Sequence, residues 1–357
     1  LSGMSYFGLV YCDGGEAAID HNIKFNFTGT YVGADAYAGL TVAGNGRMTV
    51  RSANSVILGN DSSSRGRAVV NLNGRGVLRA GDIYRTSTAN TLTEATLNFD
   101  GGTFDFLRGT NVFDRGVNAV IYGGGARIGA NSSAITVKAD SSLRLAQGSG
   151  VGHVTLTDGG SGYHAPPIVA LSGGGGSGAT AAAFIDYDSG TLTGLVVTCR
   201  GENYTGVPTV VFTGGGGSGA SATALLSANT AGALSFMGPA NTTVERMGTF
   251  NGEVRACGGS VVLSSVADAS PGMPAVTAVR MNGGRMQVGS GTSATDNALD
   301  NLINPAASLF LGGDLGGGQY RQMCGPTDNV HSQHVAALKV NVGKNSFESG
   351  GGVGHAR

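Results

Sequence analysis

Few residues of this chain have the types and spacing that catalysis or metal binding needs. His331 and His334 are three positions apart, which would let two imidazoles bind one metal ion. A zinc site takes three or four ligands, and no third ligand lies near this pair in the sequence. We therefore interpret both histidines as solvated loop residues and predict no metal site.

A second group of candidates is acidic. Asp158, together with Asp186 and Asp188, could supply calcium ligands or the paired carboxylates of a glycosidase. Either site needs several charged groups that converge on one groove, whereas the 23 acidic residues are spread thinly along the chain. Because aspartate is also a common turn residue, we expect these side chains in turns and predict that the chain is not an enzyme.

Two glycine clusters, Gly173–Gly176 and Gly214–Gly217, are each followed by Ser-Gly. They have the glycine content of a phosphate-binding loop. They lack the terminal Gly-Lys-Ser/Thr and the following helix, which would supply the cation and the helix dipole. We therefore predict no bound cofactor.

The four cysteines, Cys12, Cys199, Cys257 and Cys324, are far apart and form no CxxC motif. Four cysteines allow three pairings, and the sequence does not choose among them. Buried free thiols and one or two disulfides both remain open as interpretations.

The glycine clusters belong to a unit that is written twice between Val154 and Ser227. Internal repetition at this period is typical of stacked or tandem architectures. We predict that residues 154–186 and 196–227 adopt the same backbone conformation. The matched positions are 41 residues apart and include Tyr163 with Tyr204, Pro167 with Pro208, and Ser177 with Ser218.

The matched aromatic residues Tyr163 and Tyr204 allow two hypotheses. They could hold two equivalent sugar-binding sites, or both could be packing residues of the repeat. We favour packing and keep Tyr163 and Tyr204 as candidate ligand contacts.

A looser repeat runs from about residue 40 to residue 150. β-prone residues lead into Asn/Asp-Gly or Gly-Gly turns at Gly44, Gly74, Gly101 and Gly124, and further β-prone residues follow. The unequal spacing of these turns favours stacked coils with variable loops over a propeller of equal blades. The residues that we expect in the core are Leu72, Leu97, Phe99 and Phe104, with only one of Leu97 and Phe99 facing inward.

Composition sets the fold class. The chain has 64 glycines in 357 residues, 41% hydrophobic residues and only 13% charged residues, and it has no Gly-X-Y period. Disorder and collagen are excluded, and many short strands joined by tight turns are favoured. The fold class that we predict is all-β, a right-handed parallel β-helix or β-solenoid with a tandem β-repeat module.

We divide the chain into four parts. The first 165 residues contain no proline, which suits continuous stacked strands, so we place a boundary near residue 150. A helix is expected only over Thr295–Ile303, before Pro305. The parts are 1–40, aromatic strands that act as a cap or docking element; 41–150, the β-solenoid; 151–228, the tandem module; and 229–357, a β-rich segment with a flexible tail.

Charge and hydropathy limit the partners. The net charge of -1 gives no electrostatic case for nucleic acid, and no apolar run is long enough to cross a bilayer as a helix. The sequence starts at Leu1 without the pattern of an export signal. We expect either a signal that has been removed or a start at a processed end.

Three segments resemble bacterial autotransporter-associated β-strand repeat proteins. They are ATLNFDGGTFDF (95–106), NSVILGNDSSSRGRAVVNLNGRGVLRAGDI (54–83) and the GSGY-x(3)-P…GGGGSGATA unit. The resemblance covers about residues 40–230 and, more weakly, 250–290. It implies a right-handed parallel β-helix and export to the cell surface or the extracellular space, and it brings no catalytic residues. The usual asparagine- and threonine-rich coils are degraded after residue 230.

These observations predict an exported structural protein, a β-solenoid that assembles into a surface fibre, sheath or layer. The aromatic N-terminal strand, with Tyr6, Phe7 and Tyr11, is expected to add to the open edge of a neighbouring copy and so form a homopolymer. The alternative is an adhesin or fibre protein that binds a cell-surface glycan. A β-helix enzyme that degrades polysaccharides is the third hypothesis.

Overall fold

The protein is all-β, as predicted. The structure is a computed structural model, and it describes residues 7–25, 37–52, 54–59, 66–85, 92–109, 111–113, 116–130, 133–139, 142–264, 272–289, 301–324, 333–341 and 343–351. Strands β1–β32 cover most of these residues, and none of them is helical. The described residues contain no helix that could cross a membrane.

Two compact units make up the chain. The first comprises Leu1–Gly8, Cys12–Leu145 and Gly232–Arg357, and the second comprises Leu9–Tyr11 and Ala146–Ala231. Each is described by itself below.

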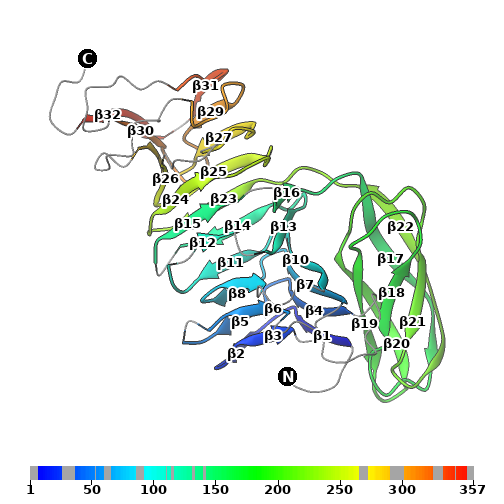
Figure 1. Ribbon diagram of the computed structural model, residues 1–357. Coiled ribbons are helices and arrows are strands. Elements are labelled where there is room, and N and C mark those ends of the chain that lie inside the picture. The colour runs from blue at the N-terminus through cyan, green and yellow to red at the C-terminus, as the bar shows by residue number, and fades with distance from the viewer. Residues whose placement is uncertain are drawn as a thin grey trace. The chain divides into compact units, whose positions relative to one another are not determined.

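The first unit is built from four sheets of mainly short strands (Figure 1). The six-stranded sheet contains β1 (Phe7–Cys12), β4 (Tyr37–Val42), β7 (Gly66–Asn73), β10 (Leu92–Asp100), β13 (Asn118–Ile121) and β16 (Leu143–Leu145). The ten-stranded sheet contains β2 (Glu16–Ile19), β5 (Arg47–Val50), β8 (Val77–Ala80), β11 (Thr103–Phe106), β14 (Ala126–Gly129), β23 (Leu234–Gly238), β25 (Glu253–Gly258), β27 (Ala278–Met281), β29 (Ser308–Leu311) and β31 (Ala337–Val340).

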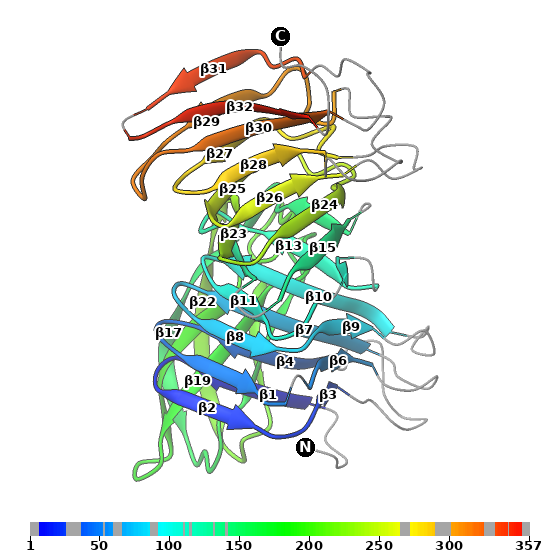
Figure 2. The same ribbon diagram turned by 90° about the vertical axis from the view of Figure 1, so that its left-hand side faces the viewer.

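The other two sheets follow the same order along the chain (Figure 2). The three-stranded sheet contains β3 (Ile23–Phe25), β6 (Val56–Leu58) and β9 (Ile83–Arg85). The seven-stranded sheet contains β12 (Asn111–Val112), β15 (Ile135–Lys138), β24 (Thr242–Arg246), β26 (Ser260–Leu263), β28 (Arg285–Val288), β30 (Gln319–Cys324) and β32 (Ser346–Gly351).

Neighbouring strands in these sheets run parallel and are never consecutive in the chain. For example, β5 pairs with β2 and β8, β7 pairs with β4 and β10, and β6 pairs with β3 and β9. Parallel neighbours need a connection of a dozen or more residues. Here the strands of the other sheets supply that connection, so consecutive strands such as β4, β5 and β6 lie in three different sheets.

The core of the first unit is a column of aligned apolar side chains. Phe99 pairs in register with Leu72 and with Ile121, and all three are 0% exposed. Leu97 is buried as well, at 1% exposure. The expectation that only one of Leu97 and Phe99 would face inward is wrong, because residues two apart on a strand share a face.

A polar ladder occupies the other face of the six-stranded sheet. The side-chain amide of Asn98 donates to Asn71 Oδ1 at 2.9 Å, and Asn71 Nδ2 donates to Thr41 Oγ1 at 3.1 Å. All three residues are buried. A buried amide without a partner would be costly, so the ladder also fixes which strands stack and in which register.

The turns between the six-stranded and ten-stranded sheets carry glycine where the sequence predicts it. Gly74 has φ +60°, a left-handed conformation that side chains rarely adopt. The next glycine, Gly76, lies so close to the preceding turn that an added Cβ would be 2.6 Å from the carbonyl carbon of Val42. At Gly102 an added Cβ would be 2.5 Å from the carbonyl carbon of Leu72. These turns therefore stack backbone on backbone.

After β16 the six-stranded sheet stops while the ten-stranded and seven-stranded sheets continue. Its place in the core is taken by buried side chains on irregular backbone, and isolated parallel bridges join Arg246 to Gly272 and Met273 to Ile303. Residues 295–300 of the expected helix lie outside the described residues, and 301–303 form a turn and this bridge instead of a helix. The buried residues of these segments are Met247, Phe250, Met273, Val276, Leu302 and Ile303.

Apart from Leu9–Tyr11, which are part of β1, the strands described in the second unit form only antiparallel pairs. One sheet consists of β17 (Ser149–Ser161) and β22 (Ser218–Ala228). The other has the order β20 (Thr191–Cys199), β19 (Thr180–Asp186), β18 (Ile168–Ser172), β21 (Thr209–Thr213). β17 also packs against β20, and β21 against β22.

The stacked turns yield a stability prediction. Gly102→Ala is expected to destabilise the protein by about 1–3 kcal/mol, because the new methyl group must displace backbone and core atoms of Leu72. Gly14→Ala is the matched control, since an added Cβ there meets nothing within 4 Å, and it should change stability by less than about 0.5 kcal/mol. Urea denaturation of both variants tests this; equal midpoints would contradict the close stacking.

Candidate functional site

The second unit has an internal two-fold relation that follows the 41-residue repeat. Ala170 and Val211 are equivalent positions, and they pair with each other in the β18–β21 ladder. The pair Ala182–Val196 on β19 and β20 corresponds to Thr223–Thr155 on β22 and β17. Even the register shifts recur, since the shift at Val151/His153 in one ladder matches that at Phe184/Ile185 in the other. The strand pairing of the two repeats is thus equivalent, which agrees with the predicted likeness of the two backbones.

The repeats exchange strands. β17, the first strand of the first repeat, pairs with β22, the last strand of the second repeat. In the same way β20, the first strand of the second repeat, pairs with β19, the last strand of the first repeat. Each half of the core is therefore assembled from both repeats: Tyr163 packs in one cluster with Ala181, Ala183 and Leu192. Tyr204 occupies the equivalent place in the second cluster. That cluster contains Val151, Val154, Ala179 and Tyr204.

The glycine clusters cover the tyrosine rings. An added Cβ at Gly217 would lie 2.5 Å from Cγ of Tyr163, and at Gly176 it would lie 2.5 Å from Cδ2 of Tyr204. Each ring is thus covered by the glycine cluster of the other repeat. The absence of a side chain is needed for this close contact between backbone and ring, which accounts for the GGGGSG sequence without a phosphate ligand.

The burial of Tyr163 and Tyr204 bears on their role as candidate ligand contacts. Their exposed fractions are 3% and 5%. A sugar-binding tyrosine offers one ring face to the ligand, and these rings offer it to glycine backbone instead. The geometry therefore favours packing residues.

The turn expectation holds for Asp188 alone, since Asp158 lies within β17 and Asp186 is the last residue of β19. The Gly160 amide donates to Asp158 Oδ1 at 2.9 Å, and the Asp188 amide donates to Asp186 Oδ1 at 2.9 Å. The amide of Asp188, followed by the hydroxyl of Ser189, lowers the pKa of Asp186, so this exposed carboxylate stays ionised. Within the described ranges no three His, Cys, Asp or Glu residues come together as a metal site would require.

The remaining predicted residues are only partly described. Tyr6 and His331 lie outside the described residues, as do the side chains of Phe7 and Cys324, while His334 is exposed. Tyr11 is half-buried and meets Phe184 edge to face, with ring centroids 5.6 Å apart and both residues in the second unit. Cys12, Cys199 and Cys257 form no disulfide bond in the part of the chain that the structure describes.

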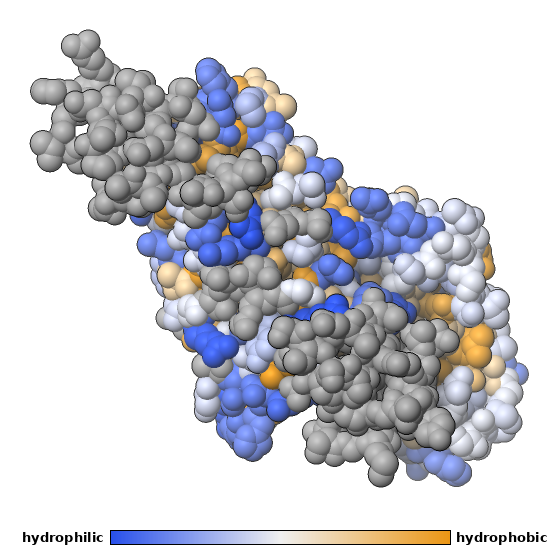
Figure 3. All heavy atoms as spheres, in the orientation of Figure 1, coloured by the Kyte–Doolittle hydropathy of each residue, from blue (hydrophilic) through white to orange (hydrophobic). Residues whose placement is uncertain are grey.

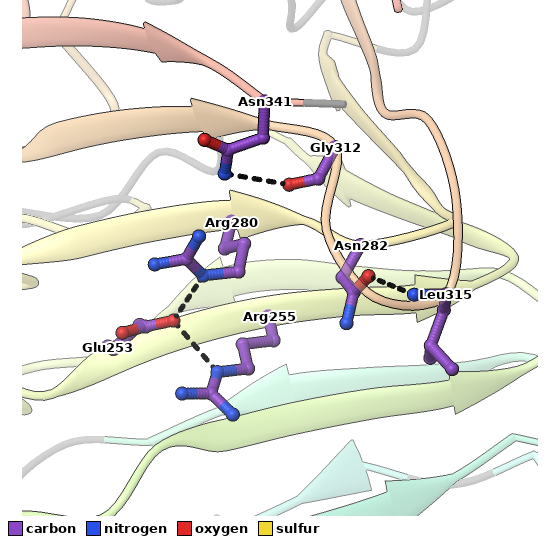
Figure 4. A network of polar contacts seen from close by, with 7 residues as sticks. All are labelled: Glu253, Arg255, Arg280, Asn282, Gly312, Leu315 and Asn341. Carbon is purple, nitrogen blue, oxygen red and sulfur yellow. Dashed lines mark hydrogen bonds and ion pairs between the residues drawn. The ribbon is translucent and has the colours of Figure 1, made fainter. Parts of the chain in front are cut away.

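A polar network on the ten-stranded sheet was not anticipated from the sequence (Figure 4). Glu253 Oε1 accepts from Arg255 Nε at 2.8 Å and from Arg280 Nε at 2.9 Å. Partial burial raises the pKa of Glu253, but the hydrogen bonds and charges of the two guanidinium groups outweigh it and leave the pKa below its usual value. Because side chains alternate along a strand, the sequence alone would place Glu253 and Arg255 on one face of β25. The position of Arg280 beside them follows only from the register between β25 and β27.

Comparison with known proteins identifies no relative: no protein-family model, no curated protein and no solved structure matches this chain.

The exchanged core predicts a symmetric response to mutation. Tyr163→Ala and Tyr204→Ala should each destabilise the second unit by about 3–5 kcal/mol, because each removes a buried ring from an equivalent cluster. Tyr187→Ala is the control in the same unit, since this ring is 73% exposed. Thermal unfolding tests the pair, and a large effect at only one of the two buried tyrosines would contradict the equivalence.

The lowered pKa of Glu253 predicts a pH-dependent difference between the wild type and Glu253→Gln. The carboxylate is favoured in the folded state, so its contribution is present above its ordinary value of 4.5 and is lost as pH falls through the lower folded pKa. The wild type should therefore be the more stable protein at pH 7, and its advantage should shrink below pH 4.5. Unfolding free energies from pH 3 to 8 test this; an advantage that grows on acidification would be inconsistent with it.

Proposed function

We propose that this chain is an extracellular structural protein whose first unit is a right-handed parallel β-solenoid that carries the tandem module and associates end to end. The strand order supports the solenoid: the chain visits the sheets in turn and then places each new strand beside an earlier one in register. Right-handedness follows from the general preference of parallel strand crossovers, about 98% of which are right-handed. The extracellular location rests on the resemblance to autotransporter-associated repeats.

One observation carries the proposed association. On β31 the side chains of Leu338 and Val340 are 49% and 61% exposed, although they are in register with Leu309 and Leu311, which are buried. On β32, Phe347 is 53% exposed and in register with the buried Tyr320. Core positions thus reach solvent at the last strand of both sheets.

A further layer of strands would cover these residues. In the order of the described sheets, β31 and β32 are end strands, so one edge of each has no neighbouring strand there. Such edges bind other strands readily, and apolar side chains beside them add a hydrophobic contribution. The proposed occupant is the N-terminal layer β1–β3 of another copy, with Phe7 and Tyr11 on β1. A head-to-tail contact of this kind does not close by two-fold symmetry and would propagate into a filament.

A second candidate function has an observation of its own. In the view of Figure 3, hydrophobic residues reach the surface of the second unit. The large exposed side chains described there are Phe184, Tyr187, Val207, Val211 and Leu225. They lie on both sheets of the unit, so each sheet has apolar side chains that could contact a receptor or glycan, which would suit an adhesin.

Sedimentation and electron microscopy of the full chain test the association. We expect filaments for the wild type, and folded monomers both for Leu338→Lys/Val340→Lys and after deletion of residues 1–15. Leu225→Lys is the control for added charge at an exposed leucine and should still assemble. Assembly that survives both changes, or a wild type that is monomeric at high concentration, would refute the proposal. Glycan-array binding by such a monomer, lost in Tyr187→Ala/Leu225→Lys, would support the adhesin instead.

A further inference from the structure

The outward face of the ten-stranded sheet carries a row of cations in register. Arg127 pairs with Ser235, Ser235 with Arg255, Arg255 with Arg280, Arg280 with Phe310, and Phe310 with Lys339. We call these six residues the basic stripe. Their neighbours along the strands, such as Val254, Val279 and Leu309, are buried, so the stripe residues point away from the core.

Two guanidinium groups in the stripe are held side by side. Glu253 binds the Nε atoms of Arg255 and Arg280 through a single oxygen, Oε1. In Figure 4 the dashed lines run from Glu253 to the Nε atom of each arginine, and none is drawn to a terminal nitrogen. The side chains of Arg255 and Arg280 are 42% and 24% exposed. Each terminal fork therefore remains available for a carboxylate, in the two-pronged geometry that arginine favours.

An aromatic ring orders the rest of the stripe. The Arg280 guanidinium carbon lies 4.1 Å from the centroid of the Phe310 ring, and Lys339 Nζ lies 5.1 Å from the same centroid. Cation–π attraction at these distances restrains both cations without neutralising them. Pre-ordered cations lose less entropy when an anion binds.

The charges of this surface do not cancel. The stripe holds four cations, and Glu253 is the single acidic residue in its polar network, which leaves three positive charges on a chain of net charge -1. Elsewhere on the same sheet Arg79 is matched by Asp105 at 2.9 Å. Neighbouring strands are about 4.8 Å apart, so the backbone positions of the stripe follow one another at that spacing. The Arg127 guanidinium donates to the carbonyls of Gly74 and Gly101, whereas Arg255 and Arg280 share Glu253.

We infer that the basic stripe binds a linear, carboxylate-bearing polysaccharide that lies across the strands. A polyuronate carries one carboxylate on each sugar, so its charges are separated on the scale of neighbouring strands. Duplex nucleic acid carries one negative charge per about 1.7 Å of its axis, a density that calls for more closely spaced cations than the stripe has. Phosphate groups would also repel the Glu253 carboxylate. Charge spacing therefore favours the polysaccharide over nucleic acid. This inference goes beyond the proposed structural function and uses the outward face of the sheet, which meets the proposed association surface only at Lys339 on β31.

Binding of the full chain to alginate, measured by isothermal titration calorimetry at low salt, tests the inference. Arg255→Gln/Arg280→Gln should weaken the affinity by about tenfold or more, because two charged hydrogen-bonding forks are lost. Lys138→Gln is the matched control: Lys138 lies on the seven-stranded sheet, 3.0 Å from Glu245, and its loss should leave alginate binding unchanged. Uncharged dextran should not bind.

Three results would overturn the inference: no binding of alginate, equal binding by the wild type and the double arginine variant, or binding of single-stranded DNA as tight as that of alginate. Sedimentation of the same samples measures assembly independently of alginate binding, so failure of this inference and failure of the proposed function can be told apart. The arginine variant should assemble as the wild type does, because the substituted residues lie on neither β31 nor β32. Intact circular dichroism and a thermal midpoint well above the temperature of the titration would exclude loss of binding through unfolding.

Discussion

Close contact between backbones at the turns is the constraint on which the first unit depends. At Gly76, Gly102 and Gly124 a Cβ would lie 2.5–2.6 Å from a backbone carbonyl carbon of a preceding strand, so only glycine fits. The carbonyl carbons are those of Val42, Leu72 and Asp100, respectively. Backbone hydrogen bonds then join successive turns, as between Val77 N and Gly46 O and between Thr103 N and Gly76 O. With the turns held in this way, the strands on either side enter their sheets in one register, which aligns Phe99 with Leu72 and Asn98 with Asn71.

The second unit uses glycine differently, although the physical requirement is related. Its glycine clusters supply a surface thin enough to lie against a tyrosine ring, at Gly176 over Tyr204 and Gly217 over Tyr163. Glycine costs about 0.5–1 kcal/mol per residue in conformational entropy relative to alanine. Burial of an aromatic ring offsets this cost, because each ring removes a large apolar area from water. The high glycine content thus reflects close packing in both units.

Local patterns in the sequence were enough to predict some features but not others. The Asn-Gly and Gly-Gly turns and the tandem unit were recognisable because each depends on residues close together in the chain. The exchange of strands between repeats was not, since β17 pairs with β22 across the whole module. The Glu253 network likewise needs the pairing of β25 with β27, which no local pattern specifies. The mistaken expectation for Leu97 and Phe99 has another cause: their spacing of two positions already places them on one face.

The two-fold relation also explains how the module can be inserted between β16 and β23. Its entry and exit lie together, because Asn229 N donates to Gly148 O at 2.9 Å and Asn229 Nδ2 donates to Gln147 O at 3.0 Å. Glu202, from the middle of the module, accepts from the Gln147 amide at 2.7 Å and secures the same point.

The point where the module begins and ends, at Gln147, Gly148 and Asn229, is equivalent through the 41-residue repeat to the hairpin between β19 and β20, at Asp186–Gly190. Entry and exit strands that meet in this way allow a domain to be inserted without straining its host. Because each repeat completes the core of the other, neither repeat alone buries its tyrosine, and the module must fold as one cooperative body.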